Sequence, residues 1–252
     1  MTQAELKEFL DYKAEQYERP VFLESDPIQI PHRFSRKEDI EIIGFLMATI
    51  AWGNRVSILK SGEKLLEIME QQPFEFINEY KQSPDLLYPF VHRTFNAGDL
   101  DFFFRSLHEI YETSNLEDCF IDPLKSGNVK SRIIHFREKF LNTAHETRST
   151  KHLSDPARNS AAKRLNMYLR WMIRSNDKGV DFGIWKTIKP AELNIPLDVH
   201  TSKYARQLGL LSRKQDDWKA LEELMINLRQ FDSKDPVKYD FALFGLGAFE
   251  KF

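Results

Sequence analysis

Residues 161–174 read AAKRLNMYLRWMIR. The large apolar side chains in this segment recur every three or four residues, which is the spacing of one face of an α-helix. At about 100° per residue, this face holds Leu165, Tyr168, Leu169, Met172 and Ile173, and the opposite face holds Lys163, Arg170 and Arg174. The segment therefore predicts an amphipathic helix whose apolar face packs against a core.

The helical pattern continues in both directions along the chain. Helices are expected over residues 2–17, 40–52, 55–69, 99–111, 132–140, 198–209 and 216–231, with a last helix from Pro236 to Gly245 or Gly247. Capping boxes at Thr2/Glu5, Ser35/Glu38 and Ser212/Gln215 mark three helix starts. The stretch 40–52 is apolar on almost every side, which indicates a central, buried helix. No strand alternation and no internal repeat is found, so the predicted fold class is all-α.

Composition excludes several classes of protein. The chain has 252 residues, of which 42% are hydrophobic and 29% charged, as in globular proteins with a sizeable core. No run approaches the roughly 18 apolar residues of a membrane span, and the first residues do not resemble a signal peptide. We therefore expect a cytoplasmic protein without a membrane partner. Cys119 is the only cysteine, which excludes disulfides, four-cysteine zinc sites and cysteine-ligated iron–sulfur clusters within the chain.

The histidines and tryptophans do not indicate a metal site or a cofactor site. His92 and His108, and likewise His145 and His152, lack the i, i+4 spacing of a helical metal pair, so no metal and no other cofactor is expected. The four tryptophans, Trp52, Trp171, Trp185 and Trp218, are expected in the core.

Charge is distributed unevenly along the chain, although its formal net value is only −2. Residues 1–150 hold 18 Lys and Arg against 25 Asp and Glu, a net −7, whereas residues 151–215 hold 13 against 5, a net +8. An acidic body with one basic segment is typical of a protein that contacts nucleic acid over part of its surface. The alternative is a solvated helix face.

Two residues have unusual positions at predicted helix starts. Lys163 lies in the first turn of its helix, where the macrodipole disfavours a cation by roughly 0.3–1 kcal/mol. The same field favours the neutral amine, which is the form that attacks in Schiff-base chemistry. Asp198 follows Pro196 at a helix N-terminus, where backbone N–H groups orient the carboxylate. A surface lysine and a simple N-cap are the alternative interpretations.

Taken together, these segments resemble a known superfamily. The stretch LDVHTSKYARQLGL, residues 197–210, resembles the Asp-x-His segment of the helix-hairpin-helix DNA glycosylases, which follows the DNA-binding hairpin and supplies the essential aspartate. KRLNMYLR, residues 163–170, is similar to the lysine helix of the 8-oxoguanine glycosylase/AP lyase branch. Residues 45–54, ending in AWGN, and 241–247, FALFGLG, are similar to its early buried helix and its closing helix. The chain also resembles an uncharacterised bacterial family placed in this superfamily.

The resemblance implies a function in base excision repair. By carry-over, Lys163 matches the nucleophile that forms a Schiff base with the sugar, and Asp198 matches the aspartate that assists it. The expected DNA contacts are Arg164, His200, Lys203 and Arg206, and the expected base-pocket residues are Trp52 and Asn54. The implied partner is damaged double-stranded DNA carrying an oxidised purine, bound by a monomer.

The resemblance also implies an architecture of two helical lobes with a ligand cleft between them. Residues 36–197 are expected to form the central lobe, and residues 1–35 together with 198–252 the second lobe. The expected fold is thus all-α and glycosylase-like, with Asp198 where the lobes join.

Two departures from the family pattern leave alternatives open. Pro156–Ser160 replaces the Gly-x-Gly turn that usually precedes the lysine, and Lys163 and Asp198 are 35 positions apart, so that residues 179–196 would be an insertion. The main alternative is therefore a helical nucleic-acid-binding protein of the same fold without catalytic activity. A protein-interaction scaffold is a third possibility.

Overall fold

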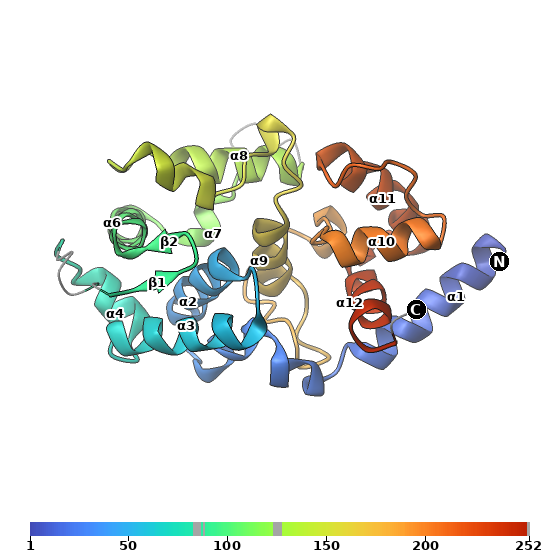
Figure 1. Cartoon of the computed structure of the whole chain (residues 1–252), viewed down its shortest axis with the longest axis horizontal. Helices are drawn as coiled ribbons and strands as arrows, with labels where there is room; N and C mark the ends of the chain where they lie inside the picture. The colour runs from blue at the N-terminus through green and yellow to red at the C-terminus, as the bar shows by residue number, and fades with distance from the viewer. Residues whose placement is uncertain (83–86, 88, 123–127, 251–252) are drawn as a thin grey trace. The chain divides into compact units, whose positions relative to one another are not determined.

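The computed structural model describes residues 1–82, 87, 89–122 and 128–250 (Figure 1). Helices dominate this part of the chain, and the strands found in it are the two-residue β1 (Val91–His92) and β2 (Phe95–Asn96). The prediction of an all-α fold is therefore confirmed. None of the described helices is both long enough and apolar enough to cross a membrane.

The chain divides into two compact units, which we call the central unit and the terminal unit. The central unit is Ser25–Leu153, and the terminal unit combines Met1–Glu24 with Ser154–Phe252. The predicted boundaries were 36 and 197, so residues 154–197 belong to a different unit from the one expected. The physical reason is a set of buried ion pairs in which Arg174 contacts Glu18 and Asp235, near the two ends of the chain.

The central unit follows the predicted helices to within a few residues. In chain order it contains the 3-10 turns η2 (Pro27–Gln29) and η3 (Pro31–Arg33), then α2 (Lys37–Ile50), α3 (Arg55–Ile68), α4 (Pro73–Asn78), the β1–β2 hairpin, α6 (Ala97–Thr113), α7 (Leu116–Cys119), α8 (Val129–Phe140) and η4 (Thr147–His152). In the antiparallel hairpin, Val91 lies opposite Asn96 and His92 opposite Phe95. This hairpin was not predicted, because two-residue strands are too short to produce an alternating pattern.

Helix α2 forms the core of the central unit. Every residue from Ile40 to Ile50 is buried, as the apolar run predicted. The ring of Phe45 lies 5.7 Å from that of Phe103 in α6 and 5.2 Å from that of Phe140 in α8. Glu41 is fully buried on this helix and accepts a hydrogen bond from the Tyr111 hydroxyl.

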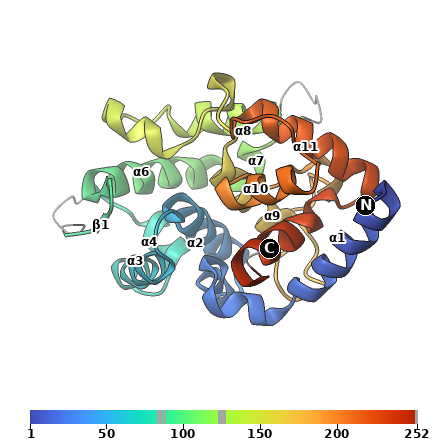
Figure 2. The same ribbon diagram turned by 45° about the vertical axis from the view of Figure 1, so that its right-hand side comes forward.

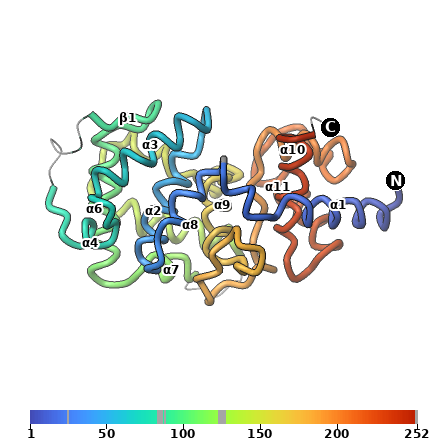
Figure 3. Tube along the Cα trace, turned by 90° about the horizontal axis from the view of Figure 1, so that it is seen from below, coloured from blue at the N-terminus to red at the C-terminus, as the bar shows by residue number. Residues whose placement is uncertain are grey.

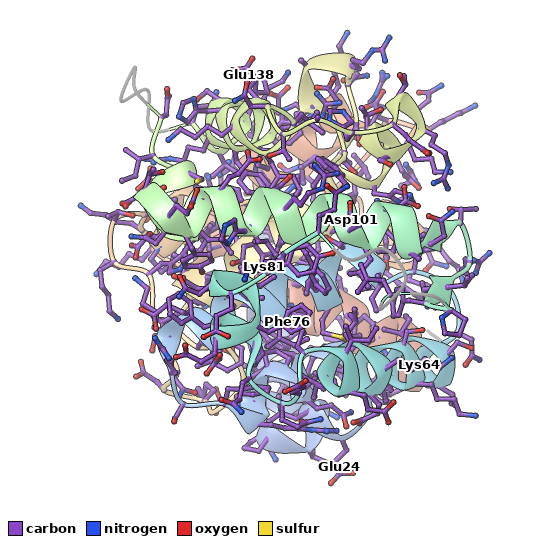
Figure 4. All side chains as sticks on the ribbon, turned by 90° about the vertical axis from the view of Figure 1, so that its left-hand side faces the viewer. Glu24, Lys64, Phe76, Lys81, Asp101 and Glu138 are labelled. Atoms are coloured by element: carbon purple, nitrogen blue, oxygen red, sulfur yellow. The ribbon has the colours of Figure 1, made fainter. Side chains whose placement is uncertain are left out.

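An aromatic contact and a hydrogen bond join α4 to α6. Figure 4 labels Phe76 of α4 and Asp101 of α6. The ring of Phe76 packs edge-on against Phe104, with 5.2 Å between ring centroids. The Tyr80 hydroxyl, just beyond α4, donates to the buried carboxylate of Asp101 at 2.8 Å. The short α4 is therefore held by the side chains of a longer helix.

The terminal unit brings together segments from both ends of the sequence. It contains α1 (Gln3–Tyr17), most of η1 (Pro20–Ser25), η5 (Pro156–Arg158), α9 (Lys163–Ile173), η6 (Pro190–Glu192), α10 (Val199–Gln207), α11 (Trp218–Phe231), η7 (Pro236–Lys238), α12 (Tyr239–Gly245) and the π-helical η8 (Leu246–Glu250). Helices α1 and α12 lie side by side (Figure 2, Figure 3). A Cβ atom on Gly245 would collide with the ring of Tyr17, so the close approach of these helices requires glycine.

The capping predictions have mixed outcomes. The Thr2/Glu5 box is confirmed. The Ser35/Glu38 box is wrong, because α2 begins after Arg36 without a side-chain cap. The Ser212/Gln215 box is also wrong, because Asp217 caps α11 and Ser212 instead binds the carboxylate of Glu223. In both cases the helix begins after a later residue than the predicted cap, after Arg36 for α2 and after Asp217 for α11.

We expect the aromatic core around α2 to dominate the stability of the central unit. Phe136 stacks on Phe120 at 4.2 Å and contacts Phe45 at 5.4 Å. Replacing Phe136 with alanine should lower the free energy of unfolding by about 3–5 kcal/mol, because it leaves a cavity among packed rings. The measurement is urea unfolding followed by circular dichroism.

The matched control is Val56→Ala, at an exposed position of α3 in the same unit. Its effect should stay within about 0.5 kcal/mol. An equal loss in both variants would contradict the assignment of this core.

Candidate active site

Lys163 and Asp198 meet at the starts of two helices of the terminal unit. The Lys163 Nζ atom lies 2.9 Å from Asp198 Oδ2, although the residues are 35 positions apart in the sequence. Lys163 is the first residue of α9, and Asp198 is the N-cap of α10. The structure thus brings together the two residues expected to carry the chemistry.

Asp198 is fixed in place by its helix. Its Oδ1 atom accepts hydrogen bonds from the backbone N–H groups of His200 at 2.9 Å and Thr201 at 2.8 Å. Oδ2 is the oxygen that contacts the Lys163 amine. The residues just before it, Ile195 and Leu197, are buried and anchor the approach to the helix. One oxygen is therefore committed to the cap, and the other is directed at the amine.

The charge state of Asp198 follows from these contacts. Burial is the largest single influence and by itself would raise the pKa of the carboxyl. The charge of Lys163 and its hydrogen bond, the hydrogen bond from the Thr201 backbone and the charge of His200 together outweigh burial, so the pKa of Asp198 lies below its ordinary value. Asp198 is accordingly ionised at neutral pH. The side chains keep 38% exposure at Lys163 and 20% at Asp198, so a ligand can reach both.

The turn before Lys163 adopts left-handed backbone conformations without glycine. Asn159 has φ 67° and Ala162 has φ 46°. Asparagine tolerates this region better than most residues, because its short side chain forms local hydrogen bonds. The sequence showed only that the hairpin glycines of the helix-hairpin-helix glycosylases have no counterpart here. The structure places Asn159 in the left-handed conformation that glycine usually adopts.

This turn is tied to the start of α11. The Asn159 side-chain amide donates to Asp217 Oδ2 at 2.8 Å, and the Trp218 backbone N–H donates to the Asn159 carbonyl at 3.0 Å. Ser160 forms an isolated β-bridge with Asp217. Sequence reasoning missed Asp217, because its partner is almost 60 residues away and no local pattern connects them.

The C-terminal part of the face of α9 opposite the apolar face is also buried. Arg170 is 3% exposed and Arg174 is 5% exposed. Arg174 donates to Asp181 at 2.7 Å and to Asp235 at 2.7 Å, and Arg170 contacts Asp181 and Asp240. A wheel projection cannot distinguish such a buried charged face from a solvated one, because the partners come from other segments.

The stretch that was expected to be an insertion covers α9. Trp185 is buried and packs edge-on against Tyr168, with 5.4 Å between ring centroids. Its backbone N–H donates to the Met172 carbonyl at 2.9 Å, and that of Phe182 donates to the Trp171 carbonyl at 2.8 Å. The irregular residues 179–196 therefore complete the core around the lysine helix.

The expected DNA contacts differ in their availability. His200 and Lys203 are exposed on α10, next to Asp198. Arg164 is partly buried, and burial lowers the pKa of its guanidinium to about 10. Arg206 is committed elsewhere: it donates to the Arg213 carbonyl at 2.8 Å and to Asp216 at 2.6 Å.

The excess of basic residues in 151–215 is thus partly neutralised inside the protein. Arg170, Arg174, Arg206 and Arg213 each pair with an acidic residue outside that segment, namely Asp240, Asp235, Asp216 and Asp217 respectively. The local net charge therefore overstates the positive charge that a polyanion would meet.

Trp52 and Asn54, the expected base-pocket residues, belong to the central unit. Asn54 caps α3 by accepting from Val56 and Ser57 N–H groups. Trp52 is half-buried, and its ring lies 5.1 Å from that of His92 and 6.0 Å from that of His152. The other three tryptophans are buried, so their assignment to the core is confirmed.

Metal-binding potential is low throughout the described ranges. Within residues 1–82, 87, 89–122 and 128–250, no group of three or more His, Cys, Asp or Glu side chains is arranged to hold an ion. Lys163 and Asp198 therefore have no metal-ligand cluster beside them among the described residues.

A family model matches residues 26–249, which is most of both units and includes Lys163 and Asp198. The chain belongs to the DUF2400 family. The description of DUF2400 is that of a protein of unknown function. Comparison with curated proteins and with solved structures gives no match.

We expect the left-handed turn to constrain substitution at Asn159. Both Asn159→Gly and Asn159→Val remove the amide contact with Asp217, but only glycine reaches a φ of 67° without a steric penalty. The valine variant should therefore be less stable than the glycine variant by about 1–2 kcal/mol. Chemical denaturation of the two variants measures the difference, and equal stabilities would mean that the turn is not held in this conformation.

Proposed function

We propose that this DUF2400 protein is a DNA N-glycosylase and AP lyase that removes an oxidised purine, such as 8-oxoguanine, from double-stranded DNA. The observation that carries the proposal is the 2.9 Å contact between the Lys163 amine and the Asp198 carboxylate. Such a pair supplies both a nucleophile and the group that takes its proton. The proposal includes a helix-hairpin-helix glycosylase-like fold, a monomer and a cytoplasmic location.

The first chemical step uses the two side chains in turn. The Lys163 ammonium transfers a proton to Asp198 Oδ2, with which it is already in contact. The neutral amine then forms a bond to C1′ of the sugar as the bond from C1′ to the base breaks. The electron pair of that bond leaves with the base, which takes the proton from Asp198 Oδ2. Asp198 is then ionised again, and its negative charge stabilises the positive charge on the sugar adduct.

The second step breaks the DNA strand. The C1′–O4′ bond of the adduct then breaks, a proton passes from the Lys163 nitrogen to O4′, and an iminium joins Lys163 to the opened sugar. Asp198 takes a proton from C2′, and the 3′-phosphate leaves by β-elimination. The iminium is the intermediate that a hydride reagent reduces to a stable amine, and this gives the function a direct test.

The surroundings of the pair support contact with DNA. His200 and Lys203 are exposed within two turns of Asp198, on the same helix. The turn at 159–162 precedes α9, as the hairpin does in the glycosylase superfamily, and Asn159 has the backbone conformation that a hairpin glycine takes. An extruded nucleotide would bring its sugar to the amine, with phosphate contacts made by exposed basic groups.

The test is covalent trapping with borohydride. Wild-type protein is incubated with a duplex that carries either 8-oxoguanine or an abasic site, and the protein–DNA adduct is measured. We expect an adduct with wild type, none with Lys163→Gln, and about 100-fold slower formation with Asp198→Asn. Asparagine retains an oxygen for the helix cap, so this variant isolates the loss of charge.

The matched control is Lys219→Gln, at an exposed position of α11 in the same unit, which should form the adduct at the wild-type rate. Absence of an adduct with wild type, or an equal adduct with Lys163→Gln, would remove the lyase function. Salt-dependent DNA binding without an adduct would instead identify a non-catalytic nucleic-acid-binding protein.

A further inference from the structure

A buried arginine connects the lysine end of α9 to a second carboxylate. Arg170 lies seven residues after Lys163, which is two turns along the same side of the helix. Its Nε donates to Asp181 at 3.2 Å, and its Nη1 donates to Asp240 in the first turn of α12. The guanidinium also lies 4.5 Å from the centre of the Phe241 ring. Arg170 is therefore held on three sides, and it holds Asp240 in turn.

Asp240 is part of the same electrostatic system as the Lys163–Asp198 pair. Its carboxyl is buried, and burial raises its pKa to about 6. The positive charges of Arg170 and Lys163 oppose this rise, while the negative charge of Asp198 adds to it. Electrostatic coupling is reciprocal. Because Lys163 and Asp198 change the pKa of Asp240, the charge of Asp240 changes the proton affinities of Lys163 and Asp198 by the same free energies.

Other charged groups lie on the elements that pack against α12. They are Glu5, Lys7, Glu8, Asp11, Lys13, Glu15 and Glu18 in or beside α1, Asp235 and Lys238 in or beside η7, His200, Lys203 and Arg206 on α10, Glu250 on η8, and Arg174 and Asp181 around α9. Several of these are already paired with one another: Lys238 contacts Asp11 and Asp232, and Arg174 contacts Glu18 and Asp235. The influences found on Asp240 itself come from Arg170, Asp198 and Lys163.

We propose that Asp240 is a positioning residue of the candidate active site, an inference that rests on the function proposed above. Held by Arg170, which lies two turns from Lys163 on the same side of α9, its ionised carboxylate adds a second negative charge that acts on the Lys163–Asp198 pair. When Asp240 is ionised, the positive charge that develops at C1′ and on the iminium meets two carboxylates; when Asp240 is protonated, it meets only one. The rate of adduct formation therefore follows the ionisation of Asp240.

The first experiment needs no DNA and leaves Asp240 unchanged. Protein labelled with ¹³C and ¹⁵N is used to follow the titration of the Asp240 carboxyl by NMR, and its signal is assigned through the bonds that connect it to the backbone. We expect a midpoint near pH 6 in wild type. Lys163→Gln should increase the proton affinity of Asp240 and Asp198→Asn should decrease it, each by about threefold or more, while the control Lys219→Gln leaves it unchanged. Identical titrations in all four proteins would overturn the inference.

The second experiment follows the rate of borohydride-trapped adduct from pH 5 to pH 8. Because its pKa is raised to about 6, Asp240 is protonated below pH 6 and ionised above it. The rate of adduct formation by wild type should therefore rise about tenfold as the pH increases through 6. Asp240→Asn should lack this step. The matched control is Asp181→Asn, which removes a buried carboxylate from the same arginines and should keep the step. A step that persists in Asp240→Asn would overturn the inference.

The two experiments separate the inference from the function on which it rests. If wild type forms no adduct, the proposed function fails, and the NMR titration alone decides whether Asp240 is coupled to the pair. If adduct forms but the titration of Asp240 ignores Lys163 and Asp198, the proposed function stands and the positioning role is overturned. If Asp240→Asn does not fold, the titration still decides, because it compares proteins that all retain Asp240.

Discussion

The terminal unit depends on the need to pair two buried guanidinium groups. Moving a cation from water into a protein interior costs several kcal/mol, unless carboxylates and hydrogen bonds replace the lost hydration. Arg170 and Arg174 of α9 meet this need through carboxylates from α1, the residues after α9, and the start of α12. Removing one partner would leave an uncompensated charge, so these segments are held around α9 as a set.

This constraint determines where the candidate chemistry occurs. The C-terminal half of α9 is covered by Trp185 and paired through its arginines, and the turn before its N-terminus is tied to Asp217 by Asn159, so the helix is held at both ends. Lys163 is the first residue of this fixed helix, and Asp198 is fixed independently as the cap of α10. The contact between them therefore joins two rigid supports, and such preorganisation is what a reacting pair requires.

Much of the helical content could be predicted from the sequence, and the long-range pairing could not. The apolar run of α2 and the 3.6-residue period of α9 identified both helices, and the aspartate after Pro196 identified the cap of α10. These signals are local. The partners of Arg170 and Arg174 and the anchoring of Asn159 by Asp217 join residues up to 156 positions apart, and no periodicity records them. For the same reason the compact units have other bounds than the predicted lobes.

The candidate site was predictable to a similar degree. The proximity of Lys163 and Asp198 was expected from a resemblance, and the structure places them in contact. Asp240 was not singled out, because an aspartate near a helix start is an ordinary feature. The ion pair between Arg206 and Asp216 was likewise not predictable. A helical arginine has the same sequence pattern whether it pairs with a neighbouring loop or binds a phosphate.

The division of the terminal unit between both ends of the sequence has a consequence for biosynthesis. The central unit is one continuous stretch, so its contacts can form as soon as that stretch leaves the ribosome. Helix α1 is made before the central unit, and its neighbour α12 and the Glu250 that binds Lys13 are made after it. Helix α1 can therefore pair with α12 only once the central unit has been made, and closing so long a chain loop slows this step of folding.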